Sequence, residues 1–208
     1  MNKTFNMIIA GVGGQGLITL LDIIACAAFW QGFDVKTSEL HGLSQRGGSV
    51  NVHIRFGKKS CSAQQKDTFC STAVYAPIVP KGKADLILAL EFQESLNALV
   101  FANAYTFFVI NNYQTPTLGE SVSYQEVESE IKKITEKIFT LPFSQHCQQK
   151  LQNDIPAGIA MLGFAVQKGL LAPITKEALE YAIQEVIAPK HYELNKQAFQ
   201  LGISLGVQ

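Results

Sequence analysis

The stretch from Glu39 to Arg55 carries the side chains of this chain that are best suited to chemistry or binding. Its first half supplies groups that donate or accept hydrogen bonds or carry charge: Glu39, His41, Ser44, Gln45 and Arg46. Gly42, Gly47 and Gly48 let the backbone turn sharply among them. A polar loop joined to a strand is a common way to hold reactive or binding groups on a rigid base.

The second half of this stretch alternates in character. Apolar residues occupy one set of alternate positions: Val50, Val52, Ile54 and Phe56. Polar residues occupy the other set: Asn51, His53 and Arg55. A period of two predicts a half-buried β-strand.

Several kinds of chemistry are conceivable for these residues. A Ser44–His41 nucleophile would need partners that converge in space, and no G-x-S-x-G elbow is present. No i, i+4 pair of histidines supports a metal site, so we expect no metal on this chain. The Arg46 guanidinium, beside two glycines, suits a carboxylate or a phosphate. A structural ion pair of Arg46 with Glu39 or Glu91 remains an equal alternative.

A second candidate site lies near the N-terminus. An apolar run, Phe5 to Ala10, precedes a polar glycine turn made of Gly11, Val12, Gly13, Gly14, Gln15 and Gly16. A helical pattern and a strand at 33–37 follow, so the segment predicts a βαβ unit. The glycines fit G-x-G-x-x-G, and Glu39 stands where an acid could bind a ribose. Main-chain N–H groups at the helix start would favour an anion. Close packing of helix and strand explains the glycines equally well.

Glu91 is the third candidate. It follows a nearly continuous apolar run at 85–90, the pattern of a strand buried in a parallel sheet. The carboxyl ends of such strands are where α/β proteins place their ligands. A charge that complements the dipole of the following helix, 92–101, is the structural alternative.

The remaining segments predict the helices and strands that position these candidate residues. We expect a polar surface excursion at 57–73, a strand at 105–110, and a helix capped by Ser123 and Glu126 that runs to about Lys137. A last strand at 137–141, a helix at 153–169, a helix capped by Thr175 and a helical C-terminus follow. The sequence thus predicts one domain, 1–208, with an α/β, three-layer, Rossmann-like fold: a largely parallel sheet with helices on both faces.

The composition of the chain argues against several classes of function. The 208 residues are 47% hydrophobic and 16% charged, with zero net charge and no block of like charges, which argues against nucleic-acid binding. No apolar stretch is long enough to predict a membrane span. The four cysteines contain no C-x-x-C pair, which favours reduced thiols in the cytoplasm and no iron–sulfur cluster on this chain. A disulfide between Cys61 and Cys70 is a minor alternative.

Three motifs together resemble a known family. They are Gly-Val-Gly-Gly-Gln-Gly at 11–16, Thr-Ser-Glu-Leu-His-Gly-Leu-Ser-Gln-Arg-Gly-Gly-Ser-Val at 37–50 and Ala-Asp-Leu-Ile-Leu-Ala-Leu-Glu at 84–91. They are similar to the gamma-type chains of 2-oxoacid:ferredoxin oxidoreductases, and the similarity extends to the 153–163 helix and the C-terminus. The segment 58–73 looks longer than the corresponding link in the family, which leaves the local partner contact open.

The resemblance implies a subunit that is inactive alone. A larger alpha subunit would hold thiamine diphosphate, Mg and iron–sulfur clusters, and this chain would hold no cofactor. The substrate would be a 2-oxo acid of the aryl pyruvate type, coenzyme A would accept the acyl group, and electrons would pass to ferredoxin. The isolated chain could form a homodimer. We expect the 11–16 and 38–48 loops to meet at the strand ends, as a partner interface or an anion pocket.

Two other functions stay open from the residues. A stand-alone Rossmann-type protein would bind a nucleotide through the glycine turn and Glu39. A non-catalytic scaffold subunit would share the fold of the enzyme subunit but contribute only to assembly.

Overall fold

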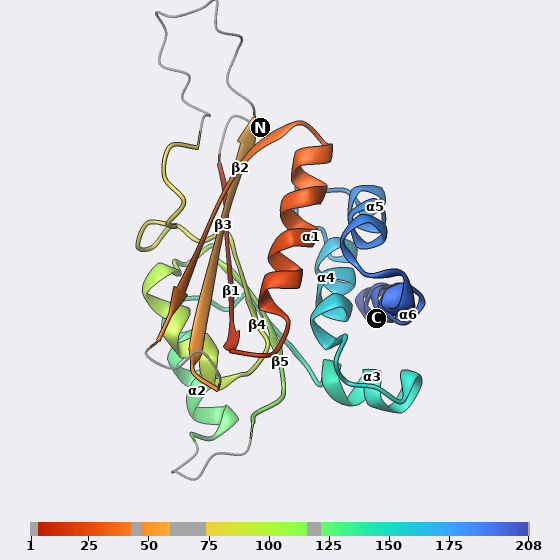
Figure 1. Ribbon diagram of the computed structural model, residues 1–208. Coiled ribbons are helices and arrows are strands. Elements are labelled where there is room, and N and C mark those ends of the chain that lie inside the picture. The colour runs from red at the N-terminus through yellow and green to blue at the C-terminus, as the bar shows by residue number, and fades with distance from the viewer. Residues whose placement is uncertain (1–3, 43–46, 59–73, 116–121, 208) are drawn as a thin grey trace, which may run out of the picture.

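The sheet determines where every candidate residue lies (Figure 1). The computed structural model describes residues 4–42, 47–58, 74–115 and 122–207. Within these residues six strands form one sheet: β1 (Phe5–Val12), β2 (Phe33–His41), β3 (Ser49–Lys58), β4 (Leu86–Ala89), β5 (Phe107–Asn111) and β6 (Ile138–Leu141). Their order is β2-β3-β1-β4-β5-β6. Only β3 of these strands is antiparallel to its neighbours, so the other five run in one direction.

Helices cover both faces of this sheet, as expected (Figure 1). One face carries α1 (Leu17–Trp30), α3 (Phe143–Leu151), α4 (Ala157–Gln167), α5 (Lys176–Val186) and α6 (Pro189–Val207). The other face carries the 3-10 helix η1 (Gln93–Phe101) and α2 (Tyr124–Lys132). Each face buries its own apolar cluster, since alternate residues of a strand point to opposite sides. The α/β fold and the helical C-terminus are therefore confirmed.

The β1–α1–β2 segment differs from the expected βαβ unit. β3 pairs with the whole of β1, from Phe5–Phe56 to Val12–Ser49. It therefore separates β1 from β2. This central position also changes the burial of β3. Val52 and Ile54 are buried on one face, as predicted, but His53 on the opposite face is fully buried too. The strand is therefore covered on both sides near its middle, because η1 packs on the polar face.

Several helices differ from the prediction in type or in the residues where they begin and end. The segment at 93–101 is helical but forms a 3-10 helix, and the helix that begins after Ser123 ends at Lys132 rather than near Lys137. Helix α4 starts at Ala157, directly after Pro156. Helix α3 was not predicted at all. Most of the 57–73 excursion, with Cys61 and Cys70, lies outside the described residues.

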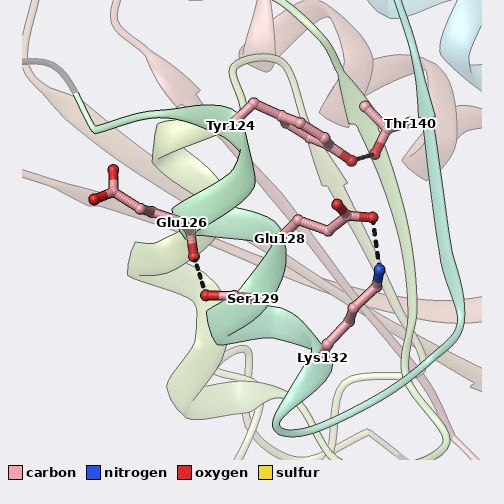
Figure 2. A network of polar contacts seen from close by, with 6 residues as sticks. All are labelled: Tyr124, Glu126, Glu128, Ser129, Lys132 and Thr140. Carbon is pink, nitrogen blue, oxygen red and sulfur yellow. Dashed lines mark hydrogen bonds and ion pairs between the residues drawn. The ribbon is translucent and has the colours of Figure 1, made fainter.

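Helix α2 is attached to the sheet by its first residue and stabilised by polar contacts along its exposed side (Figure 2). The Tyr124 hydroxyl donates to Thr140 Oγ1 of β6 at 2.8 Å. Glu128 pairs with Lys132 one turn later at 3.1 Å. The capping box is confirmed, because Ser123 accepts from the main-chain N–H of Glu126 and Glu126 accepts from that of Ser123.

The helices on the face of α1 form two layers. α1 and α4 lie on the sheet, while α5 packs against α1 and α6 packs against α4. The α4–α6 crossing depends on glycine, since a Cβ at Gly202 would lie 1.8 Å from the carbonyl oxygen of Ala160. In the parts of the chain that the structure describes, no helix is both long and apolar enough to cross a bilayer.

Candidate functional site

The candidate site lies at the sheet edge where β1, β2, β4 and β5 end and β3 begins. This edge is where parallel strands place loops that bind ligands or partners. The glycine turn, Gly47 and Gly48 before β3, Glu91 and the segment after β5 all reach it. The sheet thus gathers four groups of residues from separate parts of the sequence.

The glycine turn between β1 and α1 is conformationally specific. Gly14 has φ of 107° and Gly16 has φ of 77°, which residues with a Cβ rarely adopt. Gly16 is the N-cap of α1 and supplies no side chain to the first turn of the helix. The first N–H groups of α1 therefore have no side-chain cap at Gly16, the arrangement that favours anions at helix starts.

Gln15 folds back beneath this turn. Its Oε1 accepts from the main-chain N–H of Val12 at 2.9 Å. A Cβ at Gly11 would lie 2.8 Å from the same Oε1, so Gly11 makes room for the Gln15 side chain. The Gln15 side-chain amide thus stabilises the conformation of the glycine turn.

Gly47 and Gly48, at the described end of the 38–48 segment, meet the glycine turn as predicted. The Gly13 N–H donates to the Gly48 carbonyl at 3.0 Å, and the Gly47 N–H donates to the Gly13 carbonyl at 3.5 Å. Next to this contact, the Ser49 hydroxyl donates to Glu94 Oε2 at 2.5 Å. Ser44, Gln45 and Arg46 lie outside the described residues.

Glu91 follows β4 and links the glycine turn to the segment after β5. The Gln15 amide and the Thr115 hydroxyl both donate to Glu91 Oε1, and the Thr115 N–H donates to Oε2 at 3.2 Å. The Glu91 side chain is only 3% exposed. Glu91 therefore stands behind the site, where it positions two loops instead of reaching into solvent.

Two further side chains at this edge were missed by the sequence analysis. Asn111 ends β5; its amide donates to the Leu90 carbonyl at 3.1 Å and to the Ser144 hydroxyl at 2.7 Å. The Ser144 N–H donates back to Asn111 Oδ1 at 3.2 Å, which fixes the start of α3. The rule that selected Glu91, a polar residue at the end of a buried strand, would also have found Asn111.

Two hollows flank the starts of α1 and α4. The first, about 300 Å³, is lined by polar groups that include Gln15, Thr115 and Ser144. The second, about 410 Å³, is more apolar and extends to the α5–α6 junction at Ala188. Both are lined by Ile155, whose side chain is 82% exposed. This edge can therefore receive a group with a polar part and an apolar part.

His41 and Glu39 lie away from the glycine turn. His41 Nε2 is 2.9 Å from Glu39 Oε2 at the exposed end of β2. β3 intervenes between β2 and β1, which displaces Glu39 by one strand, roughly 4.8 Å further, from the place of a Rossmann ribose acid. The structure thus does not bring Glu39 next to the glycine turn.

The described residues do not fit a metal ion or an iron–sulfur cluster. Among them no three His, Cys, Asp or Glu side chains gather closely enough to hold a metal. Cys147 is buried, and burial followed by the charge of Asp154 raises the pKa of its thiol to about 11, which opposes thiolate ligation. Cys26 is partly exposed and is a free thiol as well.

Known proteins resemble this chain over nearly its whole length. The family model described as pyruvate ferredoxin/flavodoxin oxidoreductase matches residues 6–205. The indolepyruvate oxidoreductase subunit IorB of Archaeoglobus fulgidus is 32% identical over 97% of this chain and 95% of the relative. The subunit of the same name from Thermococcus kodakarensis is 31% identical with the same coverage.

Solved structures confirm the fold. The gamma subunit of a keto/oxoacid ferredoxin oxidoreductase from Geobacter sulfurreducens has a TM-score of 0.65 and 19% identity, and the alignment covers 98% of each chain. The 2-oxoglutarate:ferredoxin oxidoreductase from Magnetococcus marinus, a much longer chain, has a TM-score of 0.69 and 18% identity, over 99% of this chain and 31% of that one. With the family match and the curated relatives, the chain belongs to the pyruvate ferredoxin/flavodoxin oxidoreductase family and is a 2-oxoacid:ferredoxin oxidoreductase subunit.

Proposed function

We propose that this chain is the smaller subunit of an oxidoreductase that acts on indolepyruvate or a related aryl pyruvate. The observation that carries the proposal is the similarity to the indolepyruvate oxidoreductase subunits of two archaea, 31–32% over 97% of this chain. The reaction is an oxidative decarboxylation. The 2-oxo acid loses carbon dioxide, coenzyme A takes the acyl group, and the electrons pass to ferredoxin.

In this proposal the cofactors lie on a larger partner subunit. Thiamine diphosphate with Mg supplies the carbanion-stabilising chemistry there, and iron–sulfur clusters carry the electrons. A neighbour in fold has been solved with coenzyme A bound, which supports coenzyme A as the acyl acceptor.

The contribution of this chain is the braced edge formed by the glycine turn, by Gly47 and Gly48, and by Glu91. Hydrogen bonds at Gly13, Gln15 and Thr115 fix these loops to one another, so they present a preformed surface. The starts of α1 and α4 at the first hollow favour negative charge. This edge either contacts the partner subunit directly or binds an anionic part of a substrate at the junction.

The test is reconstitution. The purified chain, alone and with its candidate thiamine-binding partner, is assayed for reduction of a viologen dye by indolepyruvate and coenzyme A. We expect activity only in the mixture, and a panel of pyruvate, phenylpyruvate and 2-oxoglutarate then ranks the acids. Equal preference for 2-oxoglutarate would contradict the aryl pyruvate assignment. Size-exclusion chromatography of the isolated chain reports whether it forms a homodimer.

Arg46→Ala, with Lys190→Ala on the exposed side of α6 as the matched control, tests the site. We expect Arg46→Ala to abolish activity of the mixture while circular dichroism and chromatography show a folded chain that still binds the partner. If partner binding weakens and activity returns at high subunit concentration, the chain is a scaffold instead. A rise in melting temperature with NAD or FAD, together with an inactive mixture, would support the stand-alone nucleotide-binding function.

A further inference from the structure

A polar row on β3 faces η1 and the segment 74–79, which we call the connector. His53 is at the centre of this row and is completely buried. Its Nδ1 accepts from the main-chain N–H of Val79 at 3.1 Å. An acceptor at Nδ1 requires the neutral imidazole with its proton on Nε2. In the described parts of the chain, Nε2 has no hydrogen-bond partner, and the ring meets Phe101 of η1 at 88° with centroids 4.8 Å apart.

Two neighbouring side chains of β3 fasten the connector. Arg55 Nη1 donates to the carbonyls of Ala76 at 2.7 Å and Ile78 at 3.4 Å, while Arg55 Nε is held by Asn6 Oδ1. His53 supplies the acceptor for Val79, whose side chain is buried. Among described residues, no hydrogen bond between main-chain groups holds residues 74–79. These two side chains therefore supply the hydrogen bonds that hold the connector, in addition to the burial of Val74 and Val79.

The surroundings of His53 contain cations and two carboxylates: Asp34 of β2, and Asp85 directly before β4, which accepts from the Asn6 main-chain N–H at 2.9 Å. Partners in adjacent strands point to the same face, so Arg55 and its β2 partner Lys36 lie on the face of His53. On β1 the facing residues are the apolar Ile8 and the neutral Asn6. Asp34 pairs with Lys36.

Glu94 is the carboxylate of η1, and it accepts hydrogen bonds from the side chains of Ser49 and Asn97. The connector offers only the exposed Tyr75 as a titratable group.

We propose that His53 is a proton-sensitive latch for the connector: the neutral imidazole holds the Val79 N–H, and the imidazolium releases it. Protonation places a proton on Nδ1, so two donors then face each other and the hydrogen bond is lost. Tyr75 and Ile78 of the connector are already exposed, so its release uncovers mainly Val74 and Val79. The opening should therefore be local, with the rest of the sheet intact.

The burial of His53 determines how the stability of the closed connector changes with pH. Burial lowers the pKa of His53 below the ordinary value of 6.5. The unfolded or opened state consequently binds the proton more readily than the closed state. The closed connector is fully stable above pH 6.5, and its stability falls as the pH drops below that value.

The test follows His53 and Val79 in the same full-length, ¹⁵N-labelled chain between pH 7.5 and 5. Imidazole ¹⁵N shifts report protonation of His53, and amide hydrogen exchange, corrected for intrinsic chemistry, reports opening at Val79. We expect protection of the Val79 amide to fall by about tenfold or more as His53 protonates, while the Ile8 and Ile9 amides stay protected. Constant protection at Val79 through His53 protonation, or simultaneous loss at Ile8 and Ile9, overturns the proposal.

Two variants provide a second, independent test of the His53 latch. His53→Gln keeps an acceptor that does not titrate in this range, so its connector should stay closed at pH 5. His191→Gln, at an exposed position of α6, should keep the wild-type transition. A His53→Gln chain that opens with the same pH profile as the wild type rules out the latch. Should that variant fail to fold, the wild-type comparison of His53 shift and Val79 exchange decides by itself.

Discussion

Gln15 and Glu91 lie 76 positions apart in the chain, yet the amide of the first donates to the carboxylate of the second beneath the glycine turn. The same Gln15 side chain accepts from the Val12 N–H, and the same Glu91 oxygen accepts from Thr115. The end of β1, the end of β4 and the segment after β5 are therefore joined through one pair, the half-buried Gln15 and the buried Glu91. The Glu91 carboxylate thus holds two loops together.

This pair predicts a measurable coupling. Gln15→Ala removes a donor from a buried carboxylate and leaves the Val12 N–H without its acceptor, so we expect a loss of about 1.5–3 kcal/mol in the free energy of unfolding. Glu91→Ala should cost a similar amount. Because both changes break the same hydrogen bond, the double variant should lose less than the sum, by roughly 0.5–3 kcal/mol.

Urea denaturation of the four chains measures this cycle. Gln148→Ala, at an exposed position of α3, is the control and should change stability by less than about 0.5 kcal/mol. Strictly additive losses would show that the two residues act independently and that the proposed brace does not exist.

The α4–α6 crossing predicts a strong and specific glycine requirement. At Gly202 a Cβ would lie 1.8 Å from the Ala160 carbonyl oxygen, and at Gly163 it would lie 2.1 Å from that of Phe199. Both obstacles are main-chain atoms, so the helices must separate to admit a methyl group. We expect Gly202→Ala to destabilise the chain by at least about 2 kcal/mol, despite the higher helix propensity of alanine.

Gly206→Ala is the matched control for this crossing. Its Cβ would lie 2.9 Å from Cβ and Cγ of Gln167 and 3.3 Å from the Phe164 carbonyl oxygen, a much milder overlap than the 1.8 Å at Gly202. Thermal denaturation should therefore show a clearly smaller loss for Gly206→Ala than for Gly202→Ala. Equal melting temperatures for the two variants would mean that the crossing tolerates separation.

The sequence predicted what depends on local pattern. The apolar run before Glu91 and the turn at Gly14 and Gly16 follow from hydrophobic period and backbone freedom, and both predictions hold. The Ser123–Glu126 capping box holds for the same reason, since its hydrogen bonds lie within four residues.

What the sequence could not supply depends on contacts between distant segments. No local pattern states that β3 pairs with β1 over its length, so the place of Glu39 relative to the glycine turn was wrong. The burial of His53 depends on η1, which begins 40 positions later. The contacts of Glu91 with Gln15 and Thr115 likewise join segments that no local pattern relates.

The cap of α2 predicts an acid-dependent effect. The Ser123 main-chain N–H, then its hydroxyl, lowers the pKa of Glu126 below its ordinary 4.5. A lowered carboxyl pKa stabilises the fold above the unfolded value, and that stability is lost as the pH falls below about 4.5. The difference in stability between the wild type and Glu126→Gln should therefore be present at pH 7 and shrink towards pH 3.

Ser123→Ala removes the other half of the cap. We expect it to cost about 1 kcal/mol at pH 7, the usual loss for an N-cap. Ser129→Ala, one and a half turns into α2, removes only an exposed bond to the Glu126 carbonyl and should have little effect (Figure 2). A loss for Ser129→Ala as large as for Ser123→Ala would show that the cap has no special role.

The two described cysteines should differ sharply in reactivity. Cys147 is fully buried in the main apolar cluster, and desolvation raises the pKa of its thiol to about 11, with a smaller effect from Asp154. At pH 8 only roughly one molecule in a thousand would carry the thiolate, about a hundredfold less than for a thiol of pKa 9. Cys26 also has a raised pKa, first through burial and then through Glu185, but its side chain is only partly buried.

Pulse alkylation with iodoacetamide, read by mass spectrometry, separates the two sites. In the native chain at pH 8 we expect Cys26 to be labelled first and Cys147 to stay unmodified until urea unfolds the protein. Because labelling of Cys147 requires opening of the core, its rate should follow the urea dependence of unfolding, and Gly202→Ala should raise that rate by the factor that corresponds to its loss of stability. Native labelling of Cys147 as fast as Cys26, with no dependence on urea, would contradict its burial between α3 and the rest of the core.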